Sequence, residues 1–292
     1  MIINQANLAN LFIGYKAAFQ GAFEGVSPDW PALATVVNSS TRDEKYAWLG
    51  QWPQLREWIG DRQVKNLETH DYSIKNRDFE VTVAVGRNDI EDDMHGIYAP
   101  MMAEMGRAAG THPDELVFGL LKDGFEKACF DGQPFFDPDH PVGGGTASNV
   151  QQGAGSPWFL LNTTRSLKPI IYQVRKPYSF VSLVKEDDPN VFFKKQYIYG
   201  VDGRSNVGFG LWQMAFASKH ALNKENFVAA REAMSRLRSN EGRPLGIRPN
   251  LLVVGPGNEQ AAAELIKAER NAAGATNTLL NAVDILVTPY LD

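Results

Sequence analysis

The chain has 292 residues, of which 43% are hydrophobic, 11% aromatic and 22% charged, with a formal net charge of −5. This composition provides enough apolar surface for one large core or two modest ones, and it argues against extensive disorder. The acidic balance disfavours a protein that binds nucleic acid through a basic patch. The sequence also has no run of about 20 apolar residues, which a membrane span would need.

The sequence contains one cysteine, Cys129, which excludes a disulfide within the chain. It follows a stretch that looks like the end of an amphipathic helix, so we expect a small buried apolar residue. The first residues lack the charged and apolar segments of a secretory signal. Both features fit a soluble protein of a reducing cytoplasm.

The first predicted element is an amphipathic helix over residues 7–24, which Gly25 and the Ser27-Pro28 step should end. Its apolar residues recur at spacings of three and four and therefore share one face. Such a stripe packs into a core or docks on a neighbouring subunit, and the sequence leaves both open. The residues of the stripe are Leu8, Leu11, Phe12, Tyr15, Phe19 and Phe23.

Residues 45–60 are dense in tryptophan, with Trp48, Trp52 and Trp58. Indole rings supply large apolar area and are enriched where protein surfaces meet. A local hydrophobic cluster and a contact between subunits are equally good interpretations. Together with the hairpin that follows, these residues are our candidates for assembly contacts.

That hairpin is predicted over residues 64–86. Residues 77–85 alternate, which places Phe79 and three valines on one face of a strand. Residues 64–74 are the expected partner strand, and together the two strands form a long hairpin.

A helical tract is predicted next, over residues 89–128. Acidic residues at its start suit the helix dipole. Pro100 should kink or restart the helix, and Thr111 should cap a second start with Pro113 in the first turn.

Residues 131–157 are rich in glycine and proline and are predicted to form a mobile loop. Short strands are expected around 158–161, 169–184 and 192–200. Their apolar and β-branched residues support this reading.

The last third of the chain alternates helix and strand. Asn223 should cap a helix, residues 251–254 form an apolar strand, residues 259–269 form an alanine-rich helix, and residues 284–288 form a closing strand. The fold class is therefore α+β, without an internal repeat.

One cluster in the loop could carry chemistry: Asp131, Asp137, Asp139 and His140. Carboxylates with a histidine can hold a divalent metal. Asp-Pro turn chemistry explains the same residues, and it is the preferred interpretation.

Two further groups are weaker. The acidic run 91–93 with His95 lies on consecutive helical residues, which point in different directions. The turn at 255–257 lies between a strand and a helix, but it lacks the lysine of a phosphate-binding loop. No motif of a hydrolase or metalloprotease occurs, so we predict no catalytic site, no cofactor and no metal site.

Several blocks of the sequence resemble the Mu-like phage and prophage major head subunit family. The blocks run in order from about residue 77 to the end, and their joint order and spacing make the match specific. They are Glu91–Asp93 through Met105–Ala109, Asp131–Phe136 with Asp139–Pro141, Trp158–Leu161 through Pro169, Tyr199–Arg204, Gly208–Gln213, Gly242–Pro249 and Thr288–Leu291.

The resemblance implies the tailed-phage major capsid fold, often called the Johnson fold. In this sequence it implies an N-terminal arm over 1–45, an extended loop hairpin over 46–88 and a spine helix region over 89–128. Peripheral-domain strands with the mobile loop would occupy 129–220, and an axial-domain-like α/β segment would occupy 221–292.

The resemblance further implies a major capsid protein and not an enzyme. Its copies would form the hexamers and pentamers of an icosahedral head that encloses double-stranded DNA, which they contact non-specifically. A scaffolding protein and a portal are the expected partners, no membrane is involved, and assembly takes place in the bacterial cytoplasm before the protein resides in the virion. Alternatives are a cargo-enclosing compartment or gene-transfer particle of the same fold and, in another class, a metal-dependent enzyme using the acidic loop. We expect no covalent crosslink between subunits.

Overall fold

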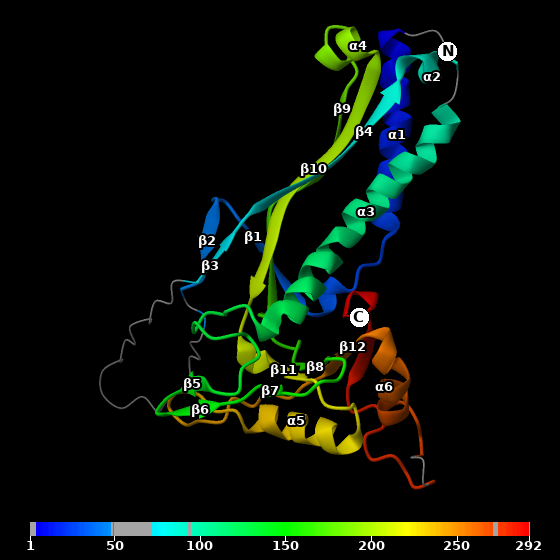
Figure 1. Cartoon of the computed structure of the whole chain (residues 1–292). Coiled ribbons are helices and arrows are strands. Elements are labelled where there is room, and N and C mark those ends of the chain that lie inside the picture. Colours follow the sequence, from blue (N-terminus) through cyan, green and yellow to red (C-terminus); the bar gives the residue numbers. More distant parts are fainter. Residues whose placement is uncertain (1–3, 48, 50–71, 93–94, 271–273, 292) are drawn as a thin grey trace.

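The structure is a computed structural model that describes residues 4–47, 49, 72–92, 95–270 and 274–291. Figure 1 shows a long twisted sheet with two helices beside it, standing on a wider base that contains a second sheet and the C-terminal helices. The order of helices and strands confirms the expected α+β class.

The long sheet has the strand order β1-β9-β10-β4. Strands β9 (Ile170–Leu183) and β10 (Gln196–Phe209) form an antiparallel hairpin, and the short helix α4 (Pro189–Lys194) caps its far end. Strand β4 (Arg77–Gly86) pairs along β10, while β1 (Ala34–Asn38) runs parallel to the base of β9. We call β4, β9, β10 and α4 the tongue.

Two helices cover one side of the tongue (Figure 1). Helix α1 (Gln5–Gly25) begins at Asn4, whose side chain accepts a hydrogen bond from the Asn7 backbone at 2.8 Å. This contact satisfies an amide that the first helical turn leaves unpaired. Helix α3 (His95–Lys122) lies against α1, and the five-residue helix α2 (Arg87–Glu91) joins β4 to it.

Two glycines allow α1 and α3 to approach closely. A Cβ atom at Gly106 would lie 2.2 Å from the backbone oxygen of Phe19, and one at Gly110 would lie 3.0 Å from the Val26 side chain. The two glycines are four residues apart and share one helical face. Any larger side chain at Gly106 would push the helices apart.

Helix α3 does not break where the sequence predicts a break. It is assigned as one helix through Pro100 and Pro113, so the expected second start at Thr111 is wrong. Instead of capping, the Thr111 hydroxyl donates back to the carbonyls of Arg107 and Ala108 at 3.2 and 3.3 Å. Packing of α3 along α1 outweighs the local cost of the prolines.

The base contains a second sheet with the order β13-β12-β8-β11-β7. Its strands β8 (Trp158–Leu161), β11 (Ala215–Ser218) and β12 (Leu251–Val254) are buried at every position, which explains why all their residues except Ser218 are apolar. Strands β7 (Val150–Gln151) and β13 (Asp284–Val287) form its edges.

Helices α5 (Lys224–Arg236) and α6 (Glu259–Ile266) pack in the same base. As predicted, Asn223 caps α5, and its side chain accepts from the Asn226 backbone at 2.9 Å. The predicted elements at 7–24, 158–161, 251–254, 259–269 and 284–288 are confirmed, with α6 ending earlier, at Ile266.

The remaining elements are short. Strand β2 (Asp43–Lys45) pairs with β3 (Ser73–Lys75), and β5 (His140–Val142) pairs with β6 (Gly145–Ala147). Single 3-10 turns connect other segments: η1 (Trp30–Ala32), η2 (Asp123–Phe125), η3 (Trp212–Met214), η4 (Pro256–Asn258) and η5 (Pro289–Leu291).

Three expectations need correction. Strand β4 pairs with β10 and not with residues 72–74, because β3 pairs with β2 instead. Residues 64–71 lie outside the described part of the chain.

The second correction concerns the strand predicted over residues 192–200. Residues 192–194 are helical, and the strand begins only at Gln196, because an Asp-Pro step starts α4.

The third correction concerns the predicted mobile loop. Phe135 and Asn149 are fully buried, and residues 150–151 join the base sheet. The Asn149 side chain donates to the Phe135 carbonyl at 2.8 Å and accepts from the Asp137 backbone at 2.9 Å. The buried residues of this segment therefore pack into the base, whereas residues 143–146 and 152–156 are exposed.

The close approach at Gly106 yields a stability prediction. We expect Gly106→Ala to lower the free energy of unfolding by about 1–3 kcal/mol, because the new methyl group overlaps the α1 backbone. The matched control is Gly119→Ala on the same helix, where a Cβ atom meets nothing within 4 Å. This variant should raise the free energy of unfolding by up to about 1 kcal/mol. Urea unfolding of the free subunit measures both. Equal effects would contradict the close-packing argument.

Candidate assembly surfaces and a buried polar cluster

An aromatic layer binds the tongue to α1. Phe180 of β9 stacks between Phe12 and Phe19 at centroid distances of 5.6 and 5.2 Å, and Tyr15 meets Tyr199 of β10 edge to face at 5.1 Å. Burial raises the pKa of Tyr199, which keeps this phenol neutral. The first helix thus packs into a core, one of the two roles that its sequence left open.

The other face of the tongue is open. Side chains alternate along a strand, so the residues next to Phe180 and Tyr199 point away from the helices. Val181 and Leu183 are each 50% exposed there, and the cross-strand neighbour of Leu183 is Ile198. The result is an apolar strip along the outer face, of the kind that marks a contact surface.

The tip of the tongue carries the most exposed large apolar side chains among the described residues. Phe192 and Phe193 of α4 are 72% and 78% exposed and meet each other edge to face at 5.0 Å. The sequence pattern did not reveal this pair, because residue 192 was predicted to lie in a strand. The preceding Asp188-Pro189 step is a helix-start signal that could have located α4.

The tongue is also attached to α3 halfway along its length, through His112. The Tyr178 hydroxyl lies 2.5 Å from His112 Nδ1, and the His112 ring contacts the edge of Phe79 with centroids 4.3 Å apart. A Cβ atom at Gly203 would overlap the Tyr178 ring at 2.6 Å, so glycine makes room for this contact. Burial lowers the pKa of His112, which favours the neutral ring.

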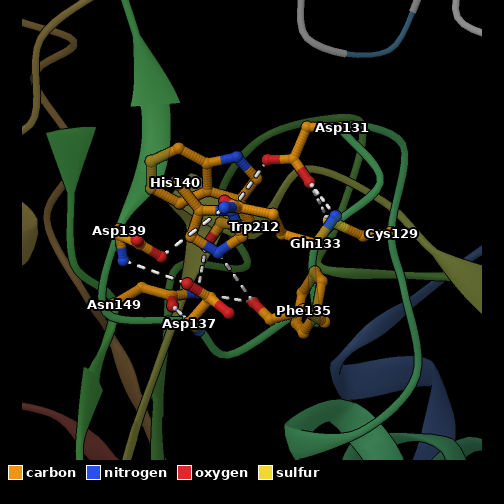
Figure 2. A network of polar contacts seen from close by, with 9 residues as sticks. All are labelled: Cys129, Asp131, Gln133, Phe135, Asp137, Asp139, His140, Asn149 and Trp212. Atoms are coloured by element: carbon orange, nitrogen blue, oxygen red, sulfur yellow. Dashed lines mark hydrogen bonds and ion pairs between the residues drawn. The ribbon is translucent and has the colours of Figure 1, made fainter. Parts of the chain in front are cut away.

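In the base, the candidate metal ligands of the sequence separate into two groups (Figure 2). Asp131 and His140 come together with Cys129 in a buried cluster whose ligand atoms lie within 4.8 Å of one another. The thiol donates to Asp131 Oδ1 at 3.1 Å, and His140 Nδ1 lies 2.7 Å from Asp131 Oδ2. We call these three residues the polar cluster.

The second nitrogen of His140 also has a partner. Nε2 lies 3.3 Å from the Phe135 carbonyl, and the ring stacks on Trp212 with centroids 4.0 Å apart and planes 4° apart. Both ring nitrogens therefore face acceptor oxygens, which leaves no lone pair directed at a metal ion. The cluster is a closed hydrogen-bond network that fastens residues 129–140 to the base.

The pKa shifts fit this structural reading. Burial alone would raise the pKa of Asp131, but the hydrogen bonds from His140 and Cys129 outweigh it and lower the pKa. Burial and the neighbouring Asp131 raise the pKa of the Cys129 thiol, so it stays protonated. A nucleophile or a soft-metal ligand needs the thiolate, which this environment disfavours.

Asp137 and Asp139 lie outside the polar cluster. The backbone amide of Asp139 donates to Asp137 Oδ1 at 3.0 Å, which is the turn chemistry that the sequence favoured. The Asp137 side chain raises the pKa of the exposed Asp139. The four predicted ligands therefore do not converge on one ion.

The other candidates of the sequence gain no site from the structure. In the first acidic group, Glu91 pairs with Arg87 at 3.0 Å, whereas Asp93 and the His95 side chain lie outside the described residues. Residues 256–258 form the 3-10 turn η4, which carries no side-chain cap. Trp48, Trp52 and Trp58 lie outside the described residues.

Comparisons with known proteins agree on one family. The family model described as "Mu-like prophage major head subunit gpT" matches residues 8–291. The major capsid protein of Escherichia phage Mu is 41% identical over 305 residues, covering 100% of both chains. The Mu-like prophage FluMu major head subunit of Haemophilus influenzae is 45% identical over 274 residues, covering 90% of this chain and 89% of that protein.

A solved structure extends the likeness to three dimensions. The chain in the procapsid of bacteriophage JBD30 is 48% identical, with a TM-score of 0.88 over 99% of this chain and 100% of that one. No helix among the described residues has the length and apolar character of a membrane span.

The polar cluster yields a pH prediction. The lowered folded-state pKa of Asp131 stabilises the fold above the unfolded pKa of about 3.9, and this contribution is lost as pH falls through the lower folded value. We expect Asp131→Asn to lower the free energy of unfolding by about 1–3 kcal/mol at pH 7. This difference from the unaltered protein should shrink below about pH 4.

Urea unfolding of the free subunit across this pH range measures the effect. Asp187→Asn is the control, because Asp187 is exposed and lies outside the cluster. A constant deficit for Asp131→Asn from pH 7 to pH 3 would contradict a stabilising role of the ionised Asp131 carboxylate.

The polar cluster also yields a metal prediction. Because its hydrogen bonds are internally satisfied, we expect the unfolding temperature to be the same in EDTA and in added Zn²⁺. Calorimetry of the free subunit checks this. A fall in EDTA that Zn²⁺ reverses, and that Asp131→Asn abolishes, would establish a metal site instead.

Proposed function

We propose how this chain builds a shell, starting from its identity: it belongs to the Mu-like prophage major head subunit gpT family and is a major capsid protein with the tailed-phage capsid fold. The match over residues 8–291 carries this conclusion. The chain is therefore a structural component of a phage-type head.

The proposed assembly consists of hexamers and pentamers of this chain in an icosahedral shell. The shape of the subunit supports it, because a long tongue with an open apolar strip offers extended contact area beyond a compact core. Shells held by many such contacts need no single large interface. The exposed strip at Val181 and Leu183 is one surface left for neighbours.

We propose roles for the segments on the same basis. The N-terminal arm (1–45), the extended loop (46–88) and the spine helix region (89–128) retain the assignments that the resemblance implies. Residues 129–220 supply the peripheral strands β9 and β10, and 221–292 supply most of the axial-domain-like base. Strands β7, β8 and β11 of the earlier segment complete the sheet of that base.

The proposed partners are a scaffolding protein, a portal and packaged double-stranded DNA. A net charge of −5 supports weak, non-specific contact with DNA. An acidic wall repels the phosphates and therefore does not trap the packaged genome. Assembly in the host cytoplasm, followed by residence in the virion, completes the proposal.

We infer that the chain has no catalytic role. Among the described residues, the cluster with the strongest claim to chemistry is Cys129, Asp131 and His140, and it is buried with a neutral thiol. Its hydrogen bonds fasten residues 129–140 to the base.

Negative-stain electron microscopy and sedimentation of the purified protein, alone and with its genomic neighbours, test the shell. We expect closed shells, tubes, or ring-shaped pentamers and hexamers. The matched control is a tongue variant, Phe180→Asp, which places a charge in the aromatic layer and should leave unassembled chain. A strictly monomeric or dimeric species under every condition would contradict the proposal.

A second measurement concerns covalent crosslinks. No carboxylate is assigned a catalytic part in joining lysine to asparagine, so we expect boiled particles to run as a single band at the monomer mass of 32.3 kDa on a denaturing gel. A ladder of multiples of this mass would show that subunits become covalently linked.

A further inference from the structure

The tongue has one irregular section, about halfway along strand β9. The pairing between β9 and β10 shifts register twice between Asp202 and Ser205, and each shift leaves residues outside the ladder. Pro177 lies in the same section and has no amide hydrogen to donate. Strand β1 pairs with β9 only as far as Val174, so no described strand covers the other edge of β9 here. We call residues 175–178 of β9, with residues 77–79 of β4 and 203–204 of β10, the joint.

The joint lies between two hydrophobic cores. On its lower side, Tyr172 and Phe209 belong to the core of the base. On its upper side, Phe180 and Val201 belong to the core that α1 shares with the upper tongue. Each core stabilises its own part of the tongue by apolar burial. The joint itself therefore depends on the contacts that its own side chains make.

On its outer face, the joint is loosely packed. A cavity of about 510 Å³ opens there, lined mostly by charged residues of β4, β9 and β10. Lys176 pairs with Asp202, and both side chains are about half exposed. Arg204 pairs with Asp78 at 3.4 Å, and the Asp78 side chain is 82% exposed. Because exposed ion pairs contribute little to stability, the outer face does not hold the joint firmly.

On the face toward the helices, His112 of α3 holds the joint. Its Nδ1 atom lies 2.5 Å from the Tyr178 hydroxyl, and its ring centroid lies 4.3 Å from that of Phe79. The His112 and Tyr178 rings also meet edge to face, with centroids 5.9 Å apart. All three side chains are only partly buried, so protons from solvent reach the His112 ring. We call His112, Tyr178 and Phe79 the clasp.

The hydrogen bond of the clasp requires a neutral His112 ring. Burial raises the pKa of the Tyr178 phenol, which therefore keeps its proton and donates it to His112 Nδ1. The acceptor is the lone pair that the neutral ring carries on this nitrogen. Protonation of the ring places a hydrogen on Nδ1, and the phenol then loses this acceptor.

The groups that face the ring come from three further positions beside its own. Glu115 of α3 favours the charged ring, whereas Arg77 of β4 opposes it, and both are exposed. From the other two strands, β9 presents the neutral Tyr178 and β10 presents Gly203. Burial is the largest influence, and it lowers the pKa of His112.

We propose that His112 is a proton-sensitive clasp between the tongue and α3. The neutral ring holds the joint against α3, and the protonated ring releases it, so that the upper tongue moves relative to the base. This device belongs to a single subunit and goes beyond the proposed shell.

The direction of the pH dependence follows from the burial of the ring. The closed clasp binds a proton less readily than the open one, in which the ring has its ordinary pKa of about 6.5. Opening is therefore favoured as pH falls below about 6.5, and the effect levels off below the lower pKa of the closed clasp. One proton changes the opening constant by at most about tenfold per pH unit.

Hydrogen exchange of the backbone amides measures the opening of the joint. The free subunit is labelled at pH 7.5, 6.5 and 5.5, and the rates are corrected for the intrinsic pH dependence of exchange. We expect exchange in residues 77–79 and 175–179 to rise by up to about tenfold between pH 6.5 and 5.5. Residues 251–254 in the base and 196–199 near the tip should change much less, because their strands stay paired.

Two variants assign the effect to the clasp. His112→Gln replaces the ring with a side chain that does not titrate, so exchange of the joint should no longer depend on pH. Tyr178→Phe keeps the aromatic ring but removes the hydroxyl. At pH 7.5 we expect this variant to raise exchange of the joint about fivefold, which corresponds to the loss of one hydrogen bond. The matched control is His220→Gln, because His220 is exposed and lies outside the clasp.

Three results would overturn the clasp. The first is exchange of the joint that stays constant between pH 7.5 and 5.5 in the unaltered protein. The second is a pH dependence that survives in His112→Gln, because another group then controls the joint. The third is an equal rise in the tip, the joint and the base, which indicates acid unfolding of the whole subunit.

Thermal unfolding at pH 7.5 shows whether each variant is folded. If His112→Gln does not fold, Tyr178→Phe decides the result: raised exchange confined to the joint supports the clasp, and unchanged exchange contradicts it. Because all these measurements use the free subunit, the clasp and the proposed shell fail separately.

Discussion

The structure depends on the close approach of α1 to α3, which Gly106 and Gly110 make possible. With the two backbones packed this closely, both helices contact the long sheet, and the aromatic side chains of α1 meet Phe180 and Tyr199 there. A strand hairpin of this length has little core of its own and is marginal without a packed face. The two helices therefore stabilise the tongue along its length, and its tip lies at the end away from the base (Figure 1).

The base also holds residues 131–157, a segment rich in glycine and proline. The five-stranded sheet is apolar on both faces, so its stability comes from burial. The preceding loop is fastened to it by directed polar contacts, in which Asp131 bridges Cys129 and His140 while the His140 ring stacks on Trp212. These residues resemble a metal site in composition, yet their hydrogen bonds satisfy one another.

A shell subunit must fold alone and still keep part of its apolar surface for its neighbours. The tongue achieves this by covering one face with helices and leaving the other face and the tip exposed. Each exposed patch is too small to aggregate free chains strongly, and it becomes effective only when repeated around a closed assembly. The distribution of apolar residues thus separates folding from assembly.

The sequence by itself determined the local elements and the family. The helical stripe of α1, the Asn223 cap and the apolar run 251–254 are short-range patterns, and each formed as predicted. The tertiary structure alone decided which strands pair and which breaks are overridden. Strand β4 found β10 more than a hundred residues away, α3 continued through Pro113, and His140 met Cys129 and Asp131 but not Asp137. Local spacing fixes the conformation that a segment prefers, whereas its partners depend on the burial gained when distant segments pack.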